Sequence, residues 1–248
     1  MVSVEKLSKS FGSHLVLDEV SLKVEEAENL IVFGRSGTGK SVLLKCMVRL
    51  MQPNSGDVSI FGKDVLSLGI DELNELRKQI GFLFQGAALY DSMSVRGNLE
   101  FPLQRHFNLT EKEIEMRVKA ALEKVSLEDA IDKMPADLSG GMKKRIGLAR
   151  AIITEPKLML YDEPTTGLDP ITSKEISKLI NDLQHELKMT SVVVTHDILC
   201  AKIIADRAVV LEDGKVLYNG DLKGLTISSD PFLRNFFSDE LIKETRRN

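Results

Sequence analysis

The stretch Gly34-Arg35-Ser36-Gly37-Thr38-Gly39-Lys40-Ser41 decides the fold of this chain. It fits G-x-x-x-x-G-K-[S/T], the pattern of a phosphate-binding loop, with an apolar run at residues 30–33 before it and a helical pattern at residues 40–51 after it. Glycines let successive backbone N–H groups face a phosphate, and the helix N-terminus adds positive potential. We expect Lys40 to reach the β- and γ-phosphates of a nucleotide and Ser41 to supply a hydroxyl to Mg²⁺. A glycine-rich turn without a ligand is the alternative.

Strand and helix patterns alternate through the rest of the chain. Apolar runs without polar alternation, which suit parallel strands covered on both faces, occupy residues 80–84, 158–161, 191–194 and 208–211. Helical patterns occupy residues 70–79, 143–153, 171–187 and 198–205. This alternation predicts an α/β fold with a P-loop core.

Three segments depart from that rhythm. Residues 95–135 contain helical patterns but no strand pattern, and Thr110-Glu-Lys-Glu113 is a capping box that starts a helix expected to end near Val125. We expect this segment to be an inserted helical lobe. The first 26 residues resemble an antiparallel meander, and Asp213-Gly214 between two apolar runs predicts a hairpin turn.

Composition limits the function. The 248 residues include 33 Lys and Arg against 37 Asp and Glu, a formal net charge of −4, which does not suggest a nucleic-acid partner. With 28% charged and 43% hydrophobic residues, we expect a folded chain, and its length allows either one large α/β domain over residues 1–248 or two smaller lobes. No uncharged apolar stretch is long enough for a membrane helix, and the charged N-terminus does not suit a signal peptide, so we expect a cytoplasmic protein. The two cysteines, Cys46 and Cys200, lie in apolar patterns and are interpreted as buried residues, not as a disulfide or zinc site.

An apolar run ends in two adjacent carboxylates, Asp162 and Glu163. Asp162 could hold a metal, and Glu163 could orient and deprotonate an attacking water, because phosphoryl transfer depends on positioning and electrostatics. Adjacent side chains of a strand face opposite ways, so we expect the pair at the strand's end, where the chain turns.

A Ser-Gly-Gly sequence precedes another helical pattern. In Leu138-Ser139-Gly140-Gly141-Met142 the small residues at a helix N-terminus could form a second anion site, although a helix start capped by Ser139 explains them equally.

These motifs, in this order over nearly the whole chain, resemble the ABC ATPases. Further matches are Gln85 after the run at 80–84, Gly167-Leu168-Asp169 after the acidic pair, and Thr195-His196 after the run at 191–194. The resemblance implies a signature at residues 138–142, a coupling and metal-contacting Gln85, a γ-phosphate sensor in His196, and Asp169 in a loop linking two sites. Phe11 occupies the position of the adenine-stacking aromatic, although a core phenylalanine is the alternative. The implied nucleotide contacts are Phe11, Gly34, Arg35, Ser36, Gly37, Thr38, Gly39, Lys40, Ser41, Ser139, Gly140, Gly141 and Asp169, with Mg²⁺ held by Ser41, Gln85 and Asp162.

Two details narrow the resemblance. Met142 stands where most ABC ATPases have Gln, and residues 86–103 read Gly-Ala-Ala-Leu-Tyr-Asp-Ser-Met-Ser-Val-Arg-Gly-Asn-Leu-Glu-Phe-Pro-Leu. Both are similar to the ATPases of Mla-type, MCE-associated phospholipid transporters. That similarity implies an integral membrane permease and an MCE lipid-binding protein as partners, at the cytoplasmic side of the cell membrane. The run Lys143-Lys144-Arg145 is interpreted as a solvated or phosphate-facing surface, not a nucleic-acid patch.

The resemblance implies an ATP hydrolase that works as a head-to-tail pair, with the signature of one copy closing over the ATP of the other. Alternatives are a soluble ABC ATPase of the iron–sulfur assembly type, an ATPase of a polar small-molecule importer, and a nucleotide switch without turnover. We expect a C-terminal helical extension at about 226–248. Within it, residues 230–248 have an amphipathic helical pattern. The apolar face of that helix either packs on the chain's own core or docks on the partner copy.

Overall fold

The computed structural model describes residues 1–234, which form two compact units. The first unit comprises Met1–Val24, Glu28–Leu66 and the described part of Val194–Asn248. The second comprises Glu25–Ala27 and Ser67–Val193.

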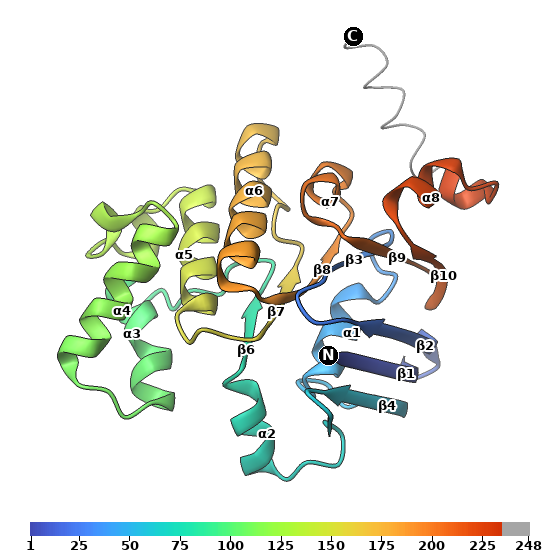
Figure 1. Cartoon of the computed structure of the whole chain (residues 1–248), viewed down its shortest axis with the longest axis horizontal. Helices are drawn as coiled ribbons and strands as arrows, with labels where there is room; N and C mark the ends of the chain where they lie inside the picture. Colours follow the sequence, from blue (N-terminus) through green and yellow to red (C-terminus); the bar gives the residue numbers. More distant parts are fainter. Residues whose placement is uncertain (235–248) are drawn as a thin grey trace. The chain divides into compact units, whose positions relative to one another are not determined.

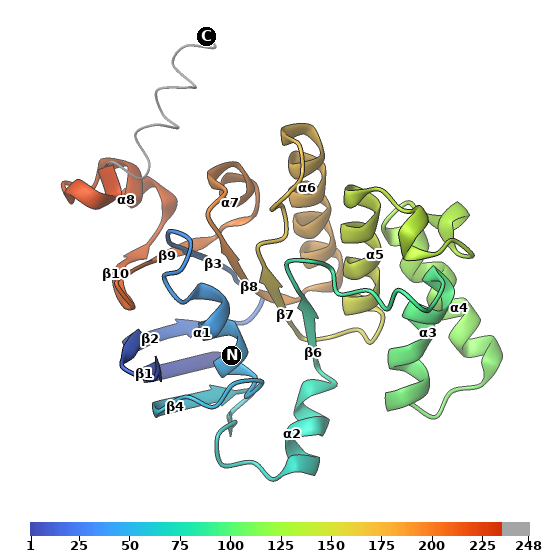
Figure 2. The same ribbon diagram turned by 180° about the vertical axis from the view of Figure 1, so that it is seen from behind.

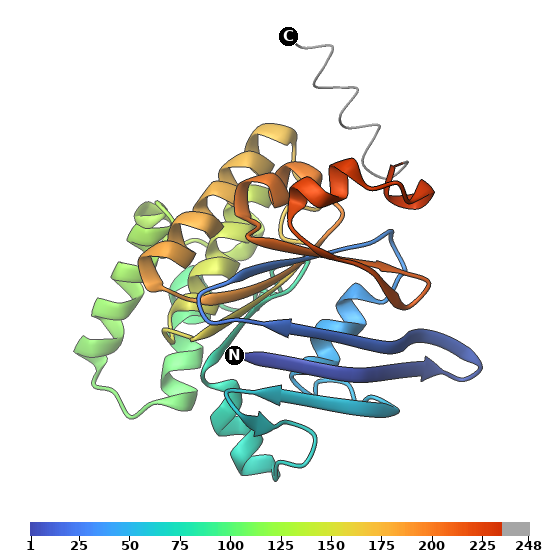
Figure 3. The ribbon, with the colours of Figure 1, turned by 45° about the vertical axis from the view of Figure 1, so that its right-hand side comes forward.

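A four-stranded antiparallel sheet forms the N-terminal part of the first unit, with the order β2-β1-β4-β5. Its strands are β1 (Val2–Phe11), β2 (His14–Val24), β4 (Ser55–Ile60) and β5 (Lys63–Asp64). Figure 3 shows β1, β2 and β4 side by side in blue and teal. The antiparallel pairing expected for the first 26 residues is confirmed. The sheet differs from a meander because β4 pairs with the other edge of β1. The sequence pattern did not indicate β4, since only Val58 and Ile60 are apolar in it.

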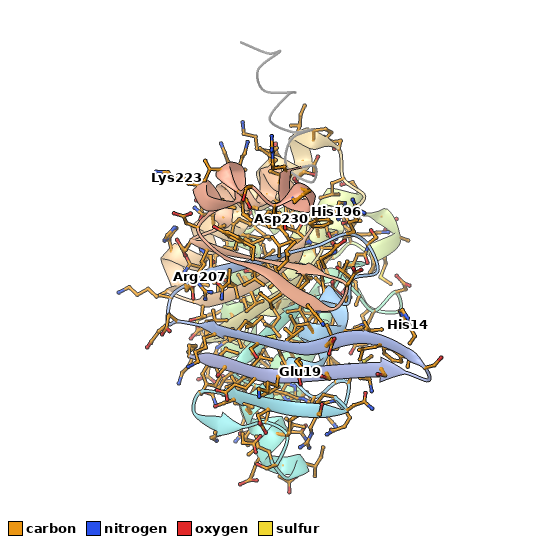
Figure 4. The ribbon with its side chains drawn as sticks, turned by 90° about the vertical axis from the view of Figure 1, so that its right-hand side faces the viewer. His14, Glu19, His196, Arg207, Lys223 and Asp230 are labelled. Atoms are coloured by element: carbon orange, nitrogen blue, oxygen red, sulfur yellow. The ribbon has the colours of Figure 1, made fainter. Side chains whose placement is uncertain are left out.

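Three further strands of the first unit lie in the order β10-β9-β3. They are β3 (Asn29–Phe33), β9 (Arg207–Glu212) and β10 (Lys215–Gly220), with β3 parallel to β9. Every residue of β3 is buried, as a strand covered on both faces requires. The predicted hairpin turn is confirmed, since Asp213 and Gly214 both have positive φ, +47° and +76°. Arg207, labelled in Figure 4, donates to the Glu28 carboxylate at 2.6 Å at the start of β9.

The helices of the first unit are α1 (Lys40–Met47), α7 (Ile198–Ile204) and α8 (Leu222–Ile227). The predicted helix over 40–51 is too long, because Arg49 adopts a φ of +51° and turns the chain. The Arg49 guanidinium then donates to the carbonyl of Val65 at 3.1 Å.

The second unit has strands in the order β8-β7-β6. They are β6 (Ile80–Leu83), β7 (Leu158–Asp162) and most of β8 (Thr190–Thr195), and β6 is parallel to β7. The unit also contains the helices α2 (Ile70–Arg77) and α6 (Pro170–Leu187). The expected strands are therefore present at each apolar run. The helix predicted over 70–79 ends two residues early, at Arg77.

Between β6 and β7 the second unit is helical. It contains α3 (Val95–His106), α4 (Glu111–Lys124), the short 3₁₀ turns Glu128–Ala130 and Pro135–Asp137, and α5 (Gly140–Ile152). Figures 1 and 2 show α3, α4 and α5 packed together, and the buried side chains they share include Leu99, Leu103, Val118, Leu122 and Ile146. The predicted capping box is confirmed: Thr110 and Glu113 exchange bonds at 2.7 Å and 3.3 Å, and α4 ends with Val125 as its C-cap.

Some sequence expectations concern single residues or the chain end. Cys46 and Cys200 are buried, as predicted, and neither forms a disulfide. Burial raises the pKa of Cys46 to about 11. No helix of residues 1–234 is long and apolar enough to cross a membrane. The helix predicted over 230–248 lies mostly outside the described residues. Within them, Asp230 Oδ1 accepts the N–H of Phe232 at 2.8 Å, and Leu233 is buried in the first unit.

Candidate active site

The loop between β3 and α1 has the curled backbone that the sequence predicts. Gly37 and Gly39 have φ values of +87° and +92°, which glycine adopts at little cost. A Cβ on Gly34 would lie 2.6 Å from the carbonyl oxygen of Leu211, and one on Gly39 would lie 2.8 Å from Leu17 Cδ2. Backbone conformation and close packing thus both require glycine in this loop.

Lys40 begins α1 and is 5% exposed. Its ammonium donates to the carbonyl oxygens of Gly34 at 2.7 Å and Arg35 at 3.0 Å, so the side chain folds back under the loop. Thr38 Oγ1 donates to the same Arg35 carbonyl at 2.9 Å. A lysine charge, a helix N-terminus and an exposed loop surface at residues 35–37 together make a site suited to a phosphate group.

The first unit also carries Phe11 and His196. Phe11 is 48% exposed as a residue, and the Lys9 ammonium lies 5.3 Å from the centroid of its ring, so the interpretation as a core phenylalanine is wrong. His196 is exposed and follows the last residue of β8 directly. The next residue, Asp197, caps α7 by accepting the N–H of Leu199 at 2.9 Å, which places His196 in a tight strand-to-helix turn (Figure 4).

In the second unit, Asp162 ends β7 and the chain turns at Glu163. Glu163 has a φ of +49°, an uncommon conformation for a residue other than glycine that costs of order 1 kcal/mol or more. Both carboxylates are buried, at 5% and 8% exposed. The Thr166 hydroxyl donates to Glu163 Oε2 at 3.1 Å. The expected turn at the strand's end is therefore present, and the glutamate side chain is held.

Two helix starts of the second unit carry the other predicted residues. Ser139 caps α5 by accepting the N–H of Met142 at 3.3 Å, while Ser139 and Gly140 are exposed and Gly141 is partly exposed. Asp169 caps α6, accepting the Thr172 hydroxyl at 2.6 Å and the backbone N–H groups of Ile171 and Thr172 at 3.0 Å. The Thr172 hydroxyl and backbone hold the pKa of Asp169 below its usual value.

The structure corrects the interpretation of the basic run in α5. Lys144 is 6% exposed, not a solvated surface residue, and its ammonium donates to the backbone carbonyls of Gln85 and of Glu163. Arg145 donates to the Val125 carbonyl and pairs with Glu175. The charge pattern gave no signal of this, because the partners of Lys144 lie 59 and 19 residues away in the chain.

The predicted site residues are thus divided between the units. Phe11, residues 34–41 and His196 belong to the first unit, whereas Gln85, Ser139, Gly140, Gly141, Asp162, Glu163 and Asp169 belong to the second. Within the second unit, Gln85 and Glu163 are joined through the ammonium of Lys144.

Nucleotide hydrolases of the ATP-binding cassette class combine three such features. They have a phosphate loop after a buried strand, two carboxylates at the end of another strand, and a Ser-Gly-Gly sequence at the start of a helix. The chain belongs to the ABC transporter family, whose model matches residues 17–166. The predicted fold class and ATP hydrolysis coupled to transport are thereby confirmed.

Curated relatives differ in cargo. The chain is 37% identical to the probable ribonucleotide transport ATP-binding protein mkl of Mycobacterium leprae, over 97% of this chain and 70% of that protein. It is 38% identical to the methionine import ATP-binding protein MetN of Clostridium tetani, over 97% of this chain and 75% of that protein. It is also 38% identical to the intermembrane phospholipid transport system ATP-binding protein MlaF of Haemophilus influenzae, over 97% of this chain and 91% of that protein.

A solved structure supports the fold. The ATP-binding cassette MJ0796, in a dimeric post-hydrolysis state bound to ADP and phosphate, matches with a TM-score of 0.82 and 33% identity, over 90% of this chain and 99% of that one.

Proposed function

We propose that residues 1–248 act as one ABC ATPase domain, with a helical lobe at about 95–135 and a C-terminal extension at about 226–248, and that two copies form head-to-tail ATP sites. The dimeric cassette bound to ADP and phosphate supports the pairing. In each site, the phosphate loop and Phe11 of one copy would hold ATP, and Ser139, Gly140, Gly141 and Asp169 of the other would close over it. A closed twofold pair gives two equivalent sites.

The residues of the chain fit the reaction. Lys40 would neutralise charge on the β- and γ-phosphates, and Glu163 would accept a proton from the attacking water as the bond between the γ-phosphorus and the bridging oxygen breaks. His196 would donate to the γ-phosphate. The observation that carries this proposal is the buried carboxylate of Glu163, held at a strand-end turn by Thr166.

The donor set suits Mg²⁺ held jointly with a nucleotide. Among residues 1–234, no three His, Cys, Asp or Glu side chains gather as a protein-only metal site. The donors that we propose are the Ser41 hydroxyl, the Gln85 amide and the Asp162 carboxylate, a set that suits an ion that keeps few protein ligands and binds phosphates. When bound, Mg²⁺ neutralises phosphate charge.

Replacing Glu163 with glutamine tests the assignment of the base. The substitution keeps size and removes the proton acceptor, so we expect kcat to fall by about 10²-fold or more while ATP affinity stays within about threefold. Glu123→Gln, at an exposed position of α4, is the matched control and should leave kcat unchanged. Turnover near the wild-type rate in Glu163→Gln would remove Glu163 from the role of base.

We infer further that the cargo is a phospholipid, moved by a separate integral membrane permease with an MCE lipid-binding protein, so that the chain works at the cytoplasmic side of the cell membrane. Support comes from the Met142-Lys143-Lys144-Arg145 signature, the sequence after Gln85, and the match over 91% of MlaF. MetN and mkl support the second candidate, an importer of polar small molecules.

A groove in the second unit supports a permease contact. It has a volume of about 580 Å³, and its lining includes Phe82, Phe84, Tyr90, Phe101 and Arg150. The rings of Phe82 and Phe84 stack at 4.1 Å, next to the segment that begins at Gln85. A lining of aromatic and basic side chains suits a short permease segment that presents apolar side chains and a carboxylate.

The cargo is tested by isolating the chain with its membrane partners from its native cells. Phospholipid enriched in the complex over the bulk membrane extract would support the lipid assignment. ATPase stimulation by methionine or a ribonucleotide, without enriched lipid, would favour the polar importer. Failure to recover any membrane protein with the chain would favour the soluble iron–sulfur assembly type.

A further inference from the structure

Helix α5 contacts residues 85–88 at three of its own positions, 144, 147 and 150, which are spaced three residues apart. Lys144 donates to the Gln85 carbonyl. A Cβ on Gly147 would lie 2.9 Å from the Cβ of Ala87, so the two backbones are in close contact there. Arg150 donates to the carbonyls of Ala87 and Ala88, each at 2.9 Å. Residues three apart lie on one face of a helix, so one face of α5 holds residues 85–88 through these three contacts.

Lys144 also binds a second segment, the turn at Glu163. Its ammonium also donates to the Glu163 carbonyl at 3.2 Å, and that carbonyl belongs to the residue with a φ of +49°. A backbone held in an uncommon conformation persists only where its surroundings restrain it. One buried ammonium thus restrains both the turn at Glu163 and the first residue of the segment after β6.

Burial opposes the charge of Lys144, and two nearby carboxylates offset part of that effect. Burial lowers its pKa, while the carboxylates of Glu163 and Asp162 act in the opposite direction. A buried lysine with hydrogen-bond acceptors is expensive to replace with a group that leaves those acceptors unsatisfied. Packing alone would be served as well by methionine, which has a similar length and no charge.

We propose that Lys144 is a positioning residue for ATP hydrolysis, holding the backbone of Glu163 and the Gln85 segment in one fixed arrangement. It acts through Glu163 and does not itself touch the reacting atoms. Because the same ammonium binds both segments, a displacement of the Gln85 segment changes the position of Glu163. This inference rests on the proposed role of Glu163 as the base.

Steady-state kinetics on the full chain test the inference with three variants. Lys144→Met removes charge and donors, and we expect kcat to fall by about 10-fold to 10²-fold with the KM for ATP within about threefold, since misplacement of a catalytic group has effects of this size. Lys144→Arg keeps a cation with N–H donors and should return kcat to within about fivefold of wild type. Lys112→Met, at an exposed lysine of α4, is the control for charge removal and should not change kcat.

Hydrogen exchange supplies a readout independent of turnover. In Lys144→Met, peptides that cover residues 85–90 and 163–167 should exchange faster, while peptides of α4 stay unchanged, because local restraints determine local opening. Should Lys144→Met not fold, Lys144→Gln, which keeps an N–H donor at a shorter reach, takes its place in both measurements. A kcat within about twofold of wild type, or unchanged exchange at both segments, would overturn the inference.

A double substitution separates this inference from the proposed function. If Lys144 acts through Glu163, adding Lys144→Met to Glu163→Gln should change the residual single-turnover rate by less than about twofold. Effects that multiply would show that Lys144 acts independently, and the inference would be wrong. Glu163→Gln with normal turnover contradicts the proposed function, whereas an inactive Glu163→Gln together with a normal Lys144→Met contradicts only the inference.

Discussion

Asn98 holds together the segment that joins Gln85 to helix α3. The side chain is fully buried. Its Oδ1 accepts the N–H of Tyr90 at 2.8 Å, and the two hydrogens of its Nδ2 are shared among the carbonyls of Tyr90, Met93 and Ser94, each at 3.1 Å. Replacing Asn98 with alanine removes these bonds and a longer one that Oδ1 accepts from Arg150 at 3.5 Å, and we expect it to destabilise the second unit.

The size of the effect follows from the bonds lost. The Tyr90 and Ser94 carbonyls keep partners, because the backbone N–H groups of residues 93 and 98 still donate to them at 3.1 Å and 2.9 Å. Two bonds, to the Tyr90 N–H and the Met93 carbonyl, are therefore lost without replacement. At about 1 kcal/mol net for each bond, the loss is about 2 kcal/mol. The higher helix propensity of alanine returns up to about 0.7 kcal/mol. The free energy of unfolding should therefore fall by about 1–2 kcal/mol, which lowers the melting temperature of a chain of this size by about 3–8 °C.

Urea unfolding and thermal melting, both followed by circular dichroism on the full chain, measure this loss. Asn74→Ala is the matched control, because Asn74 lies in α2 with an exposed side chain and gains the same helix propensity. We expect that control to leave stability unchanged or slightly raised. A loss below about 0.5 kcal/mol for Asn98→Ala, or one equal to that of Asn74→Ala, would refute the view that these hydrogen bonds hold the segment.

Three further predictions concern the nucleotide sites and the C-terminus. Lys40→Ala should weaken ATP binding by about tenfold or more, measured by calorimetry, because it removes a cation beside the β- and γ-phosphates; an affinity equal to that of Glu163→Gln would contradict this. Mixing Lys40→Ala with Ser139→Ala chains should restore part of the ATPase activity, since one of the two mixed sites is intact, and mixed dimers without activity would argue against shared sites. Truncation before Asp230 should lower the melting temperature, because burial of Leu233 in the first unit contributes about 1.5–3 kcal/mol. Light scattering on the truncated chain tests the docking alternative, which predicts a folded monomer.

Local sequence determined the features that depend on neighbours in the chain. The curl of residues 34–41, the Thr110–Glu113 capping box, the Asp213-Gly214 turn and the start of α5 at Ser139 were all predictable. Each depends on backbone conformation or on hydrogen bonds between residues a few positions apart. The apolar runs likewise indicated the buried strands, because strands covered on both faces need no polar alternation.

Tertiary structure decided what distant segments do to one another. The exposure of Phe11, the pairing of β4 with β1 and the end of α1 at Met47 depend on neighbours far along the chain, and no local pattern encodes them. Lys144 is the clearest case. Its sequence context is a run of three basic residues on a helix, which usually lies in solvent, whereas packing of α5 against the ends of β6 and β7 removes it from water and gives its ammonium two backbone carbonyls. A charge pattern describes the side chains of one helix, but burial depends on which other segments cover that helix, and only the folded chain specifies them.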